Sequence, residues 1–232
     1  VPAHFKEEFL AETVRRGEKV VVKCQAFGDR PISVTWKKDG QLLDKQAEKK
    51  YTIDETMTDE GVTSEVHIVS ADRRDSSLFT CVAENSFGKD EMNIQIIVQE
   101  RPDKPFKVTA HESTSRTISI SWSPPYSGNS PILSYTIQYK PSSGSWKDDS
   151  KDLTASGADS KASIAGLLPA TTYHFRVMAE NSFGKSDFSS YVSATTDLEV
   201  PGGPPLNVQA DAVGSHTLRV TCLQHSNYRM ED

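Results

Sequence analysis

Apolar and polar residues alternate in short runs along most of the chain. In the run EKVVVKCQAF at 18–27, Val20, Val22, Cys24 and Ala26 share one parity and would face one side of a strand. Such runs are rich in Val, Ile, Thr, Ser and Tyr, and Pro, Gly, Asn and Asp interrupt them every 8 to 12 residues or so, at about the spacing of short strands. No long stretch has helical periodicity. The pattern predicts an all-β sandwich or barrel.

The alternation falls into two units of similar length. In the second unit the inward positions are Ile118, Ile120 and Trp122 in one run and Tyr135, Ile137 and Tyr139 in the next. A chain of 232 residues suits about two domains. We therefore predict tandem β-sandwiches, with a first domain at 1–99, a linker at 100–104 and a second domain at 105–197. Residues 198–232 are interpreted as the truncated start of a further domain with a divergent tail.

Two inward-facing cysteines and a tryptophan distinguish the first unit. Cys24 and Cys81 lie 57 positions apart on two predicted strands and can meet across a sandwich, where Trp36 can pack on them. A disulfide closing a loop of that length stabilises by about 4 kcal/mol in the chain-entropy model. The alternative is a pair of buried reduced thiols, as in cytosolic muscle domains. Neither cysteine has the C-x-x-C spacing or the neighbouring histidines of a metal site.

The first unit resembles the immunoglobulin fold, of the intermediate set. The resemblance rests on Cys24, Trp36 and a D-x-S-x-F-x-C motif that ends at Cys81. In that motif Phe79 stands where the family usually has Tyr. The hydrogen bond that the tyrosine hydroxyl makes at this corner is therefore expected to be absent.

The second unit resembles a fibronectin type III domain. Trp122 and the L-x-P-x-T-x-Y motif from Leu167 to Tyr173 carry the resemblance, because that motif is typical of the tyrosine corner of these domains. No cysteine lies between positions 82 and 221. The second sandwich is therefore expected to be held together by its core alone.

The heptapeptide AENSFGK occurs at 83–89 and again at 179–185. In both copies we predict a hairpin turn between two strands, with Asn85 and Asn181 bonding the backbone and Gly88 and Gly184 supplying a positive φ. The simplest interpretation is shared turn chemistry. An exposed aromatic ring at a loop tip could also contact a partner, which makes Phe87 and Phe183 candidates.

The segments outside the two units differ in character. The stretch VQERPDKP at 98–105 has two prolines, which predict a stiff linker and sandwiches placed end to end. Residues 203–221 resemble the opening of another fibronectin type III domain, but Cys222 stands where its tryptophan is expected. About 30 residues cannot bury a sandwich core, so Cys222 is expected to be an unpaired thiol.

Charge and motifs exclude several functions. The formal net charge of −6 does not suit nucleic acid or anionic membranes, which attract basic patches. No run reaches the roughly 18 apolar residues of a membrane span, and the opening VPAHFKEEF is not a signal peptide. If the protein is secreted or membrane-bound, we interpret the chain as an internal piece of it.

No pattern of residues suggests catalysis or a bound cofactor. The six histidines are scattered, and the sequence contains no nucleophile elbow, phosphate-binding loop or dinucleotide-binding glycine motif. The acidic clusters Asp148-Asp149 and Asp54-Glu55 are interpreted as solvated loops and not as calcium sites. We predict no enzyme activity, no cofactor and no metal in this segment.

Outward-facing apolar residues provide one candidate for a lateral interface. Val82 and Met178 have outward parity on equivalent strands of the two units, and Ile97 has it on the next strand of the first. Apolar residues on such a face can mark a contact, although isolated exposed ones are normal.

The order of the units and four stretches resemble the Down syndrome cell adhesion molecule (Dscam) family. The stretches are VQERPDKP, PPYSGNSPI, LPATTYHFRV and GPP-x-N-V, and the resemblance covers residues 1 to about 221, with invertebrate members, arthropod forms included, fitting best. It implies the last immunoglobulin domain and the first fibronectin type III domain of a single-pass surface receptor that acts by homophilic adhesion in neuronal wiring, self-avoidance or immune recognition. In the family, recognition lies in more N-terminal domains, so this piece would be an extracellular stalk.

Two other classes of protein fit the same domain order. Intracellular muscle proteins of the titin or twitchin type also alternate these folds, and their cysteines would be reduced. The third possible class is the ectodomain of a receptor kinase or phosphatase. The stalk hypothesis predicts that Cys24 and Cys81 are oxidised.

Overall fold

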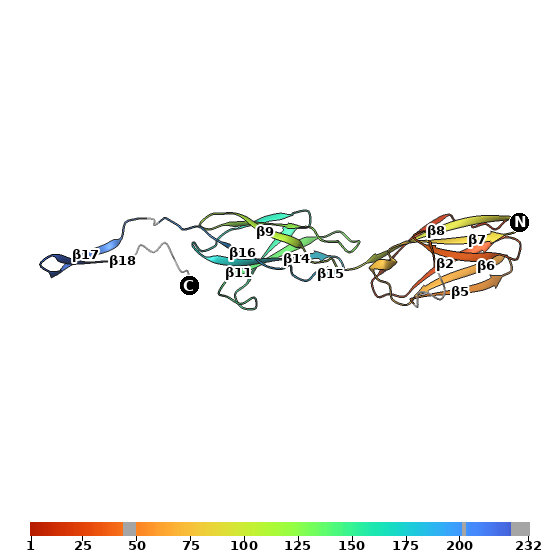
Figure 1. Cartoon of the computed structure of the whole chain (residues 1–232), viewed down its shortest axis with the longest axis horizontal. Coiled ribbons are helices and arrows are strands. Elements are labelled where there is room, and N and C mark those ends of the chain that lie inside the picture. The colour runs from red at the N-terminus through yellow and green to blue at the C-terminus, as the bar shows by residue number, and fades with distance from the viewer. Residues whose placement is uncertain (44–49, 201–202, 224–232) are drawn as a thin grey trace.

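The computed structural model describes residues 1–43, 50–200 and 203–223. In these ranges the chain forms two β-sandwiches that lie end to end, followed by a β-hairpin beyond the second sandwich (Figure 1). The single helical element in the described ranges is the short 3-10 helix η1 (Arg73–Asp75). The predicted all-β fold class is therefore confirmed.

The first sandwich packs a five-stranded sheet against a three-stranded sheet. The larger sheet has the order β1-β8-β7-β3-β4, and β1 runs parallel to β8. Its strands are β1 (Phe9–Arg15), β3 (Ser33–Lys38), β4 (Gln41–Leu42), β7 (Leu78–Asn85) and β8 (Gly88–Gln99). The facing sheet has the order β2-β6-β5, with β2 (Val20–Phe27), β5 (Tyr51–Thr58) and β6 (Gly61–Ile68).

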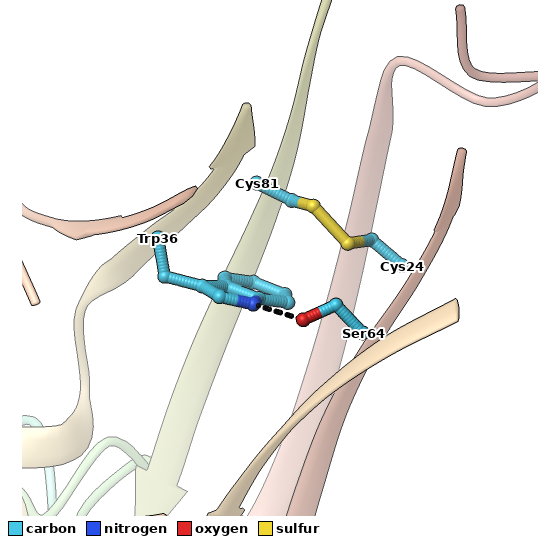
Figure 2. The surroundings of a disulfide bond; sticks show 4 residues. All are labelled: Cys24, Trp36, Ser64 and Cys81. Atoms are coloured by element: carbon cyan, nitrogen blue, oxygen red, sulfur yellow. Dashed lines mark hydrogen bonds between the residues drawn. A yellow bond between two sulfur atoms is a disulfide. The ribbon is translucent and has the colours of Figure 1, made fainter. Parts of the chain in front are cut away.

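A disulfide joins the two sheets of the first sandwich. Cys24 on β2 and Cys81 on β7 are bonded, as predicted, and both are buried. The indole of Trp36 lies beside the bridge and donates to the Ser64 hydroxyl at 2.9 Å (Figure 2). Ser64 is completely buried, so this bond satisfies the polar atoms of both side chains in the core.

Phe79 packs in the core of the first sandwich. The buried carboxylate of Asp75 accepts hydrogen bonds from residues close to it, including Tyr51, whose ring contacts Phe79. The ring of Phe79 meets the ring of Tyr51 edge-on. The Tyr51 hydroxyl donates to Asp75 at 2.7 Å, and the Lys50 ammonium and the Asp72 N–H donate to the same carboxylate. Tyr51 thus supplies a buried hydroxyl bond from a different strand, which the sequence motif did not indicate.

The second sandwich also has two sheets but no disulfide. One sheet has the order β13-β10-β9, with β9 (Phe106–Ser113), β10 (Ile118–Ser123) and β13 (Lys161–Ile164). The other has the order β12-β11-β14-β15, and β16 also pairs with β14. Its strands are β11 (Ser134–Pro141), β12 (Lys151–Ser156), β14 (Thr172–Asn181), β15 (Gly184–Lys185) and β16 (Val192–Thr195).

Aromatic residues fill the core of the second sandwich. Trp122, Leu167 and Tyr173 are buried, and Trp122 packs on Tyr135 with ring centroids 5.1 Å apart. The Leu168 N–H donates to the Tyr173 hydroxyl oxygen at 3.0 Å, which closes the corner between β13 and β14. Burial raises the pKa of the Tyr135 hydroxyl.

The final described segment is a hairpin of β17 (Leu206–Gly214) and β18 (Thr217–Leu223). The residues of β17 are all exposed, and Cys222 on β18 is an exposed free thiol. The predicted tail beyond it lies outside the described residues. Across the described ranges, no helix has the length and apolar character needed to cross a membrane.

Candidate functional site: the junction between the two domains

The second sandwich holds the incoming chain with two loops at the end nearest the first sandwich. The Glu100 N–H donates to the Gly128 carbonyl oxygen at 3.0 Å. The Asn181 side-chain amide donates to the carbonyl oxygens of Glu100 and Ser127, at 2.8 Å each. We call Ser127, Gly128 and Asn181 the second clamp. It fixes the backbone at the point where the chain enters the second domain.

Glycine is required in this clamp because the two backbones nearly touch. A Cβ atom placed on Gly128 would lie 2.0 Å from the Glu100 carbonyl oxygen. Gly128 also has a φ of 73°, which glycine adopts at little cost. Any side chain at this position would therefore push the entering chain away from its loop.

The first sandwich has the same arrangement at its own entry. The Asn85 side-chain amide donates to the carbonyl oxygens of Val1 and Asp29, at 3.0 and 2.9 Å. Its oxygen accepts from the Ala3 N–H at 3.1 Å. A Cβ atom on Gly28 would lie 2.8 Å from the Pro2 carbonyl oxygen. Gly28, Asp29 and Asn85 form the first clamp.

The repeated heptapeptide therefore does two things in each domain. It makes the predicted turn, because Asn85 accepts from the Phe87 N–H at 3.0 Å and Asn181 accepts from the Phe183 N–H at 2.8 Å. It also uses the amide of the same asparagine to hold the entering chain. The sequence alone indicated the first role and missed the second, since the carbonyl of the entering chain that each asparagine reaches lies more than 80 positions away.

One detail of the predicted turn is wrong. Gly184 has a positive φ of 137°, as expected, but Gly88 is not among the residues with positive φ. A Cβ atom on Gly88 would lie 2.9 Å from the Cβ of Pro2. Close packing against the entering chain, and not a left-handed backbone, explains the glycine in the first copy.

A buried carboxylate forms the centre of the junction. The side chain of Glu100 is only 2% exposed, and it accepts from Arg16 at 2.8 Å and from Arg73 at 2.6 Å. Both arginines belong to the first domain, whereas the main chain of Glu100 is bound by the second. Removing one partner of a buried, paired charge is costly. Glu100 thus couples the two domains through a single residue.

Arg73 extends this network to the second domain. Its guanidinium donates two hydrogen bonds to the Asp103 carboxylate, at 3.0 and 2.8 Å, in a bidentate ion pair. It also lies 4.0 Å from the centre of the Tyr126 ring. The hydrogen bond from Arg73 lowers the pKa of Asp103 although burial opposes it. The bond to Asp103 likewise raises the pKa of Arg73, with Glu100 adding to the effect. Burial raises the pKa of Tyr126.

Side chains of the second domain also bond to the first domain. The side-chain amide of Asn129, from the second domain, donates to the Val98 carbonyl oxygen at 2.9 Å and to the Ser76 hydroxyl at 3.2 Å. The Gln99 amide donates to the Asn129 carbonyl oxygen at 3.2 Å. Each domain therefore bonds the backbone of the other, and the predicted stiffness of the linker has a source besides its prolines.

The two aromatic residues of the repeats have different surroundings. Phe87 is 62% exposed. Phe183 is half-buried and lies 5.6 Å from the guanidinium of Arg15, a residue of the first domain. The contact predicted for an aromatic ring at the loop tip thus occurs inside this chain for Phe183.

The candidate lateral interface does not form a shared patch. Val82 is 4% exposed and not at the surface, which corrects its predicted exposure. It lies on β7, and the ion pair of Lys37 on β3 with Glu91 on β8, at 3.6 Å, crosses over that strand. Ile97 is half-buried and lies six positions beyond Glu91, the partner of Val82, which separates the two by roughly 20 Å. Met178 is half-buried on β14 of the other domain.

The acidic clusters, His67 and His174 contact neighbouring side chains or the backbone. Asp148 and Asp149 accept bonds from Ser145. The imidazole of His67 lies 3.3 Å from Asp54. Burial, with help from Lys140, lowers the pKa of His174. No group of three or more metal-ligating side chains comes together in the part of the chain that the structure describes.

Family profiles agree with the assignment of both folds. The profile of the immunoglobulin I-set domain matches residues 3–98, and that of the fibronectin type III domain matches residues 103–195. A crystal structure of domains A168–A170 from titin has a TM-score of 0.43 at 25% identity, covering 85% of this chain and 67% of that one.

Relatives with curated descriptions match across both domains. The chain is 40% identical to the cell adhesion molecule Dscam1 of Drosophila melanogaster over 220 residues, or 95% of the chain and 11% of the relative. It is 35% identical to the cell adhesion molecule DSCAM of Homo sapiens over 89% of the chain and 10% of the relative. The chain thus spans about a tenth of the length of these relatives.

Proposed function

Because the chain belongs to the Dscam family of cell adhesion molecules, we propose that it is a stiff spacer in the extracellular part of an adhesion receptor. The receptor is a single-pass protein of the plasma membrane or a secreted form of it. The spacer holds other, recognising domains at a set distance and orientation. We propose for the whole receptor the homophilic adhesion, neuronal wiring, self-avoidance and immune roles that the family resemblance implies.

The observation that carries the proposal is the pairing of Glu100. A flexible linker leaves two domains free to rotate, and relative domain motion is the normal expectation unless the interface is substantial. Here the first residue after β8 is buried, paired with two arginines of one domain and held by Asn181 of the other. Bending at this point would break charge-assisted bonds on both sides.

The spacer hypothesis predicts that Glu100→Gln loosens the junction without unfolding either domain. Loss of the negative charge removes the ion pairs with Arg16 and Arg73 and leaves two guanidinium groups facing a neutral amide. The domains would then tumble with separate correlation times in NMR relaxation, and the distribution of distances in solution scattering would broaden. The parent chain should show one correlation time for both domains.

The matched control is Glu199→Gln, which makes the same chemical change where Glu199 pairs with Arg116 at 2.7 Å, away from the junction. It should leave the joint tumbling unchanged. If Glu100→Gln leaves it unchanged as well, or if the parent domains already tumble independently, the spacer hypothesis fails.

We propose that homophilic recognition belongs to other parts of the receptor. Val82, Ile97 and Met178 lie apart from one another, which supports this view. Analytical ultracentrifugation of the chain should find a monomer, and a charged residue in place of the half-buried Ile97 should not change that state. A dimer that this substitution dissociates would restore a lateral interface here.

The adhesion hypothesis is favoured over the two other classes. The disulfide is the state expected outside the cell and not in muscle cytoplasm. The relatives reported above are described as cell adhesion molecules, which supports the adhesion hypothesis. Thiol titration of the native protein should therefore detect Cys222 alone.

A further inference from the structure

A groove between the two domains has an unusual concentration of positive charge. It measures about 420 Å³ and is lined by Arg15, Arg16, Gln99, Glu100, Arg101, Ser182 and Phe183. Its lining residues carry three positive charges and one negative, in a chain with a net charge of −6. The groove is therefore a local exception to the charge of the whole protein.

The single carboxylate of the groove is already neutralised. Glu100 is bonded to Arg16 and, on its other oxygen, to Arg73. It therefore does not compensate Arg15 or Arg101. Burial of this carboxylate also fixes Arg16 in position, because its guanidinium is bonded at 2.8 Å.

The two remaining arginines have donors to spare. Among the described residues, no carboxylate pairs with Arg15, whose guanidinium lies over the Phe183 ring. Glu18 bonds only the backbone N–H of Arg15. Arg101 makes long contacts from one nitrogen, at 3.4 Å to the Lys185 carbonyl oxygen and 3.5 Å to the exposed Asp187.

Planar guanidinium groups present paired N–H donors that match the oxygens of sulfate and phosphate. Clefts that concentrate one sign of charge attract the opposite charge more strongly than the net charge suggests. The volume lies in the range of small-molecule sites, and Phe183 supplies an apolar wall on which a sugar ring can pack.

We propose that this groove binds a sulfated glycosaminoglycan, with Arg15 and Arg101 contacting its sulfate groups. The choice of a glycan over other oxyanions rests on the extracellular location proposed above. Binding at the junction would engage both domains at once, because Arg15 comes from the first, Arg101 from the linker and Phe183 from the second.

The test is retention on immobilised heparin at neutral pH under a rising salt gradient. The parent chain should be retained in spite of its acidic composition. The double variant Arg15→Ala/Arg101→Ala should elute at much lower salt, with affinity falling about tenfold for each arginine removed. These substitutions leave the bonds of Glu100 in place, so joint tumbling by NMR should persist.

A control variant, Lys151→Ala/Arg219→Ala, removes the same charge from exposed residues that do not line the groove. It should elute with the parent chain. Passage of the parent chain through the column, or equal losses in both double variants, overturns the proposal. Binding of inorganic sulfate without retention on heparin overturns the assignment to a glycan.

Because tumbling and retention are measured separately, failure here differs from failure of the spacer hypothesis. Normal joint tumbling without heparin retention removes only the glycan site. Independent tumbling in the parent chain removes the spacer and leaves the retention result to stand by itself.

Discussion

The two sandwiches receive the chain in the same way but are closed differently. Each uses a glycine loop and the asparagine of AENSFGK to bind the entering backbone. The first is then joined internally by Cys24–Cys81, whereas the second relies on its aromatic core and tyrosine corner. The clamp that binds the entering chain is therefore repeated in both domains, whereas the interactions that close each sandwich internally differ.

The two clamps also differ in what covers them. Asn181 is buried between the domains, and Phe183 meets Arg15 of the first domain. Asn85 is only half-buried, and Phe87 projects into solvent. The same seven residues therefore contribute more when a neighbouring domain excludes water from them, because a hydrogen bond is stronger and its loss more costly once it is desolvated.

The largest expected difference between the domains concerns the disulfide. In the double variant Cys24→Ala/Cys81→Ala, the free energy of unfolding of the first domain should fall by about 4 kcal/mol, because a closed loop of 57 residues no longer restricts the unfolded chain. Differential scanning calorimetry should show a lower unfolding temperature for the immunoglobulin domain and an unchanged one for the fibronectin type III domain.

The matching control is Cys222→Ala, which removes an exposed free thiol and should shift neither transition. If the double variant moves both transitions by the same amount, the two domains unfold as one unit and the contrast drawn above is wrong.

A smaller difference is expected between the two asparagines. Asn181→Ala should destabilise the second domain by about 1–3 kcal/mol, since the buried carbonyl oxygen of Glu100 and the partly buried one of Ser127 lose their donor. Asn85→Ala should cost the first domain about 1 kcal/mol or less, because water can reach the half-buried site and replace the amide. Urea unfolding monitored by NMR at resolved signals of each domain measures both values. An equal or larger loss for Asn85→Ala contradicts the role given to burial.

The smallest effect is a dependence of the junction on pH. Arg73 lowers the pKa of Asp103 below its ordinary value of 3.8, so the formed junction favours the ionised carboxylate. Its contribution is complete above pH 3.8 and is lost as the pH falls through the lowered pKa. Joint tumbling of the domains should therefore weaken on acidification.

Asp103→Asn isolates this contribution from the other carboxylates that titrate in the same range. The variant should show a weaker junction at neutral pH and a shallower loss of joint tumbling in acid than the parent chain. Superimposable pH curves for the two proteins rule out a role for Asp103.

Much of the fold could be predicted because it depends on local alternation. The parity of Val20, Val22, Cys24 and Ala26 placed them in the core without reference to any other strand, and all four are buried. The turn made by AENSFGK was equally local, since Asn85 and Asn181 bond residues only two positions ahead. The domain boundaries predicted at 1–99, 105–197 and 198–232, with a linker at 100–104, stay a prediction.

Parity failed where long side chains reach across a sheet. It placed Val82 outward, and the strand does point it outward, but Lys37 and Glu91 join above it. Alternation along one strand contains no information about side chains on the strands at either side. The same limit hid the bond from Tyr51 to Asp75, which joins β5 to η1.

By itself the sequence determined two sandwiches in series, the cysteines that bridge the first and the turn that each repeat makes, because these depend on residues near one another or on a motif of fixed spacing. Only the tertiary structure decided that Glu100 is a buried carboxylate paired with Arg16 and Arg73. It also decided that the repeated asparagines donate hydrogen bonds to the backbone of the entering chain. The physical reason is that the sequence around a charged linker residue gives no sign that the residue is buried. Its burial depends on two folded domains that approach each other closely enough to exclude water.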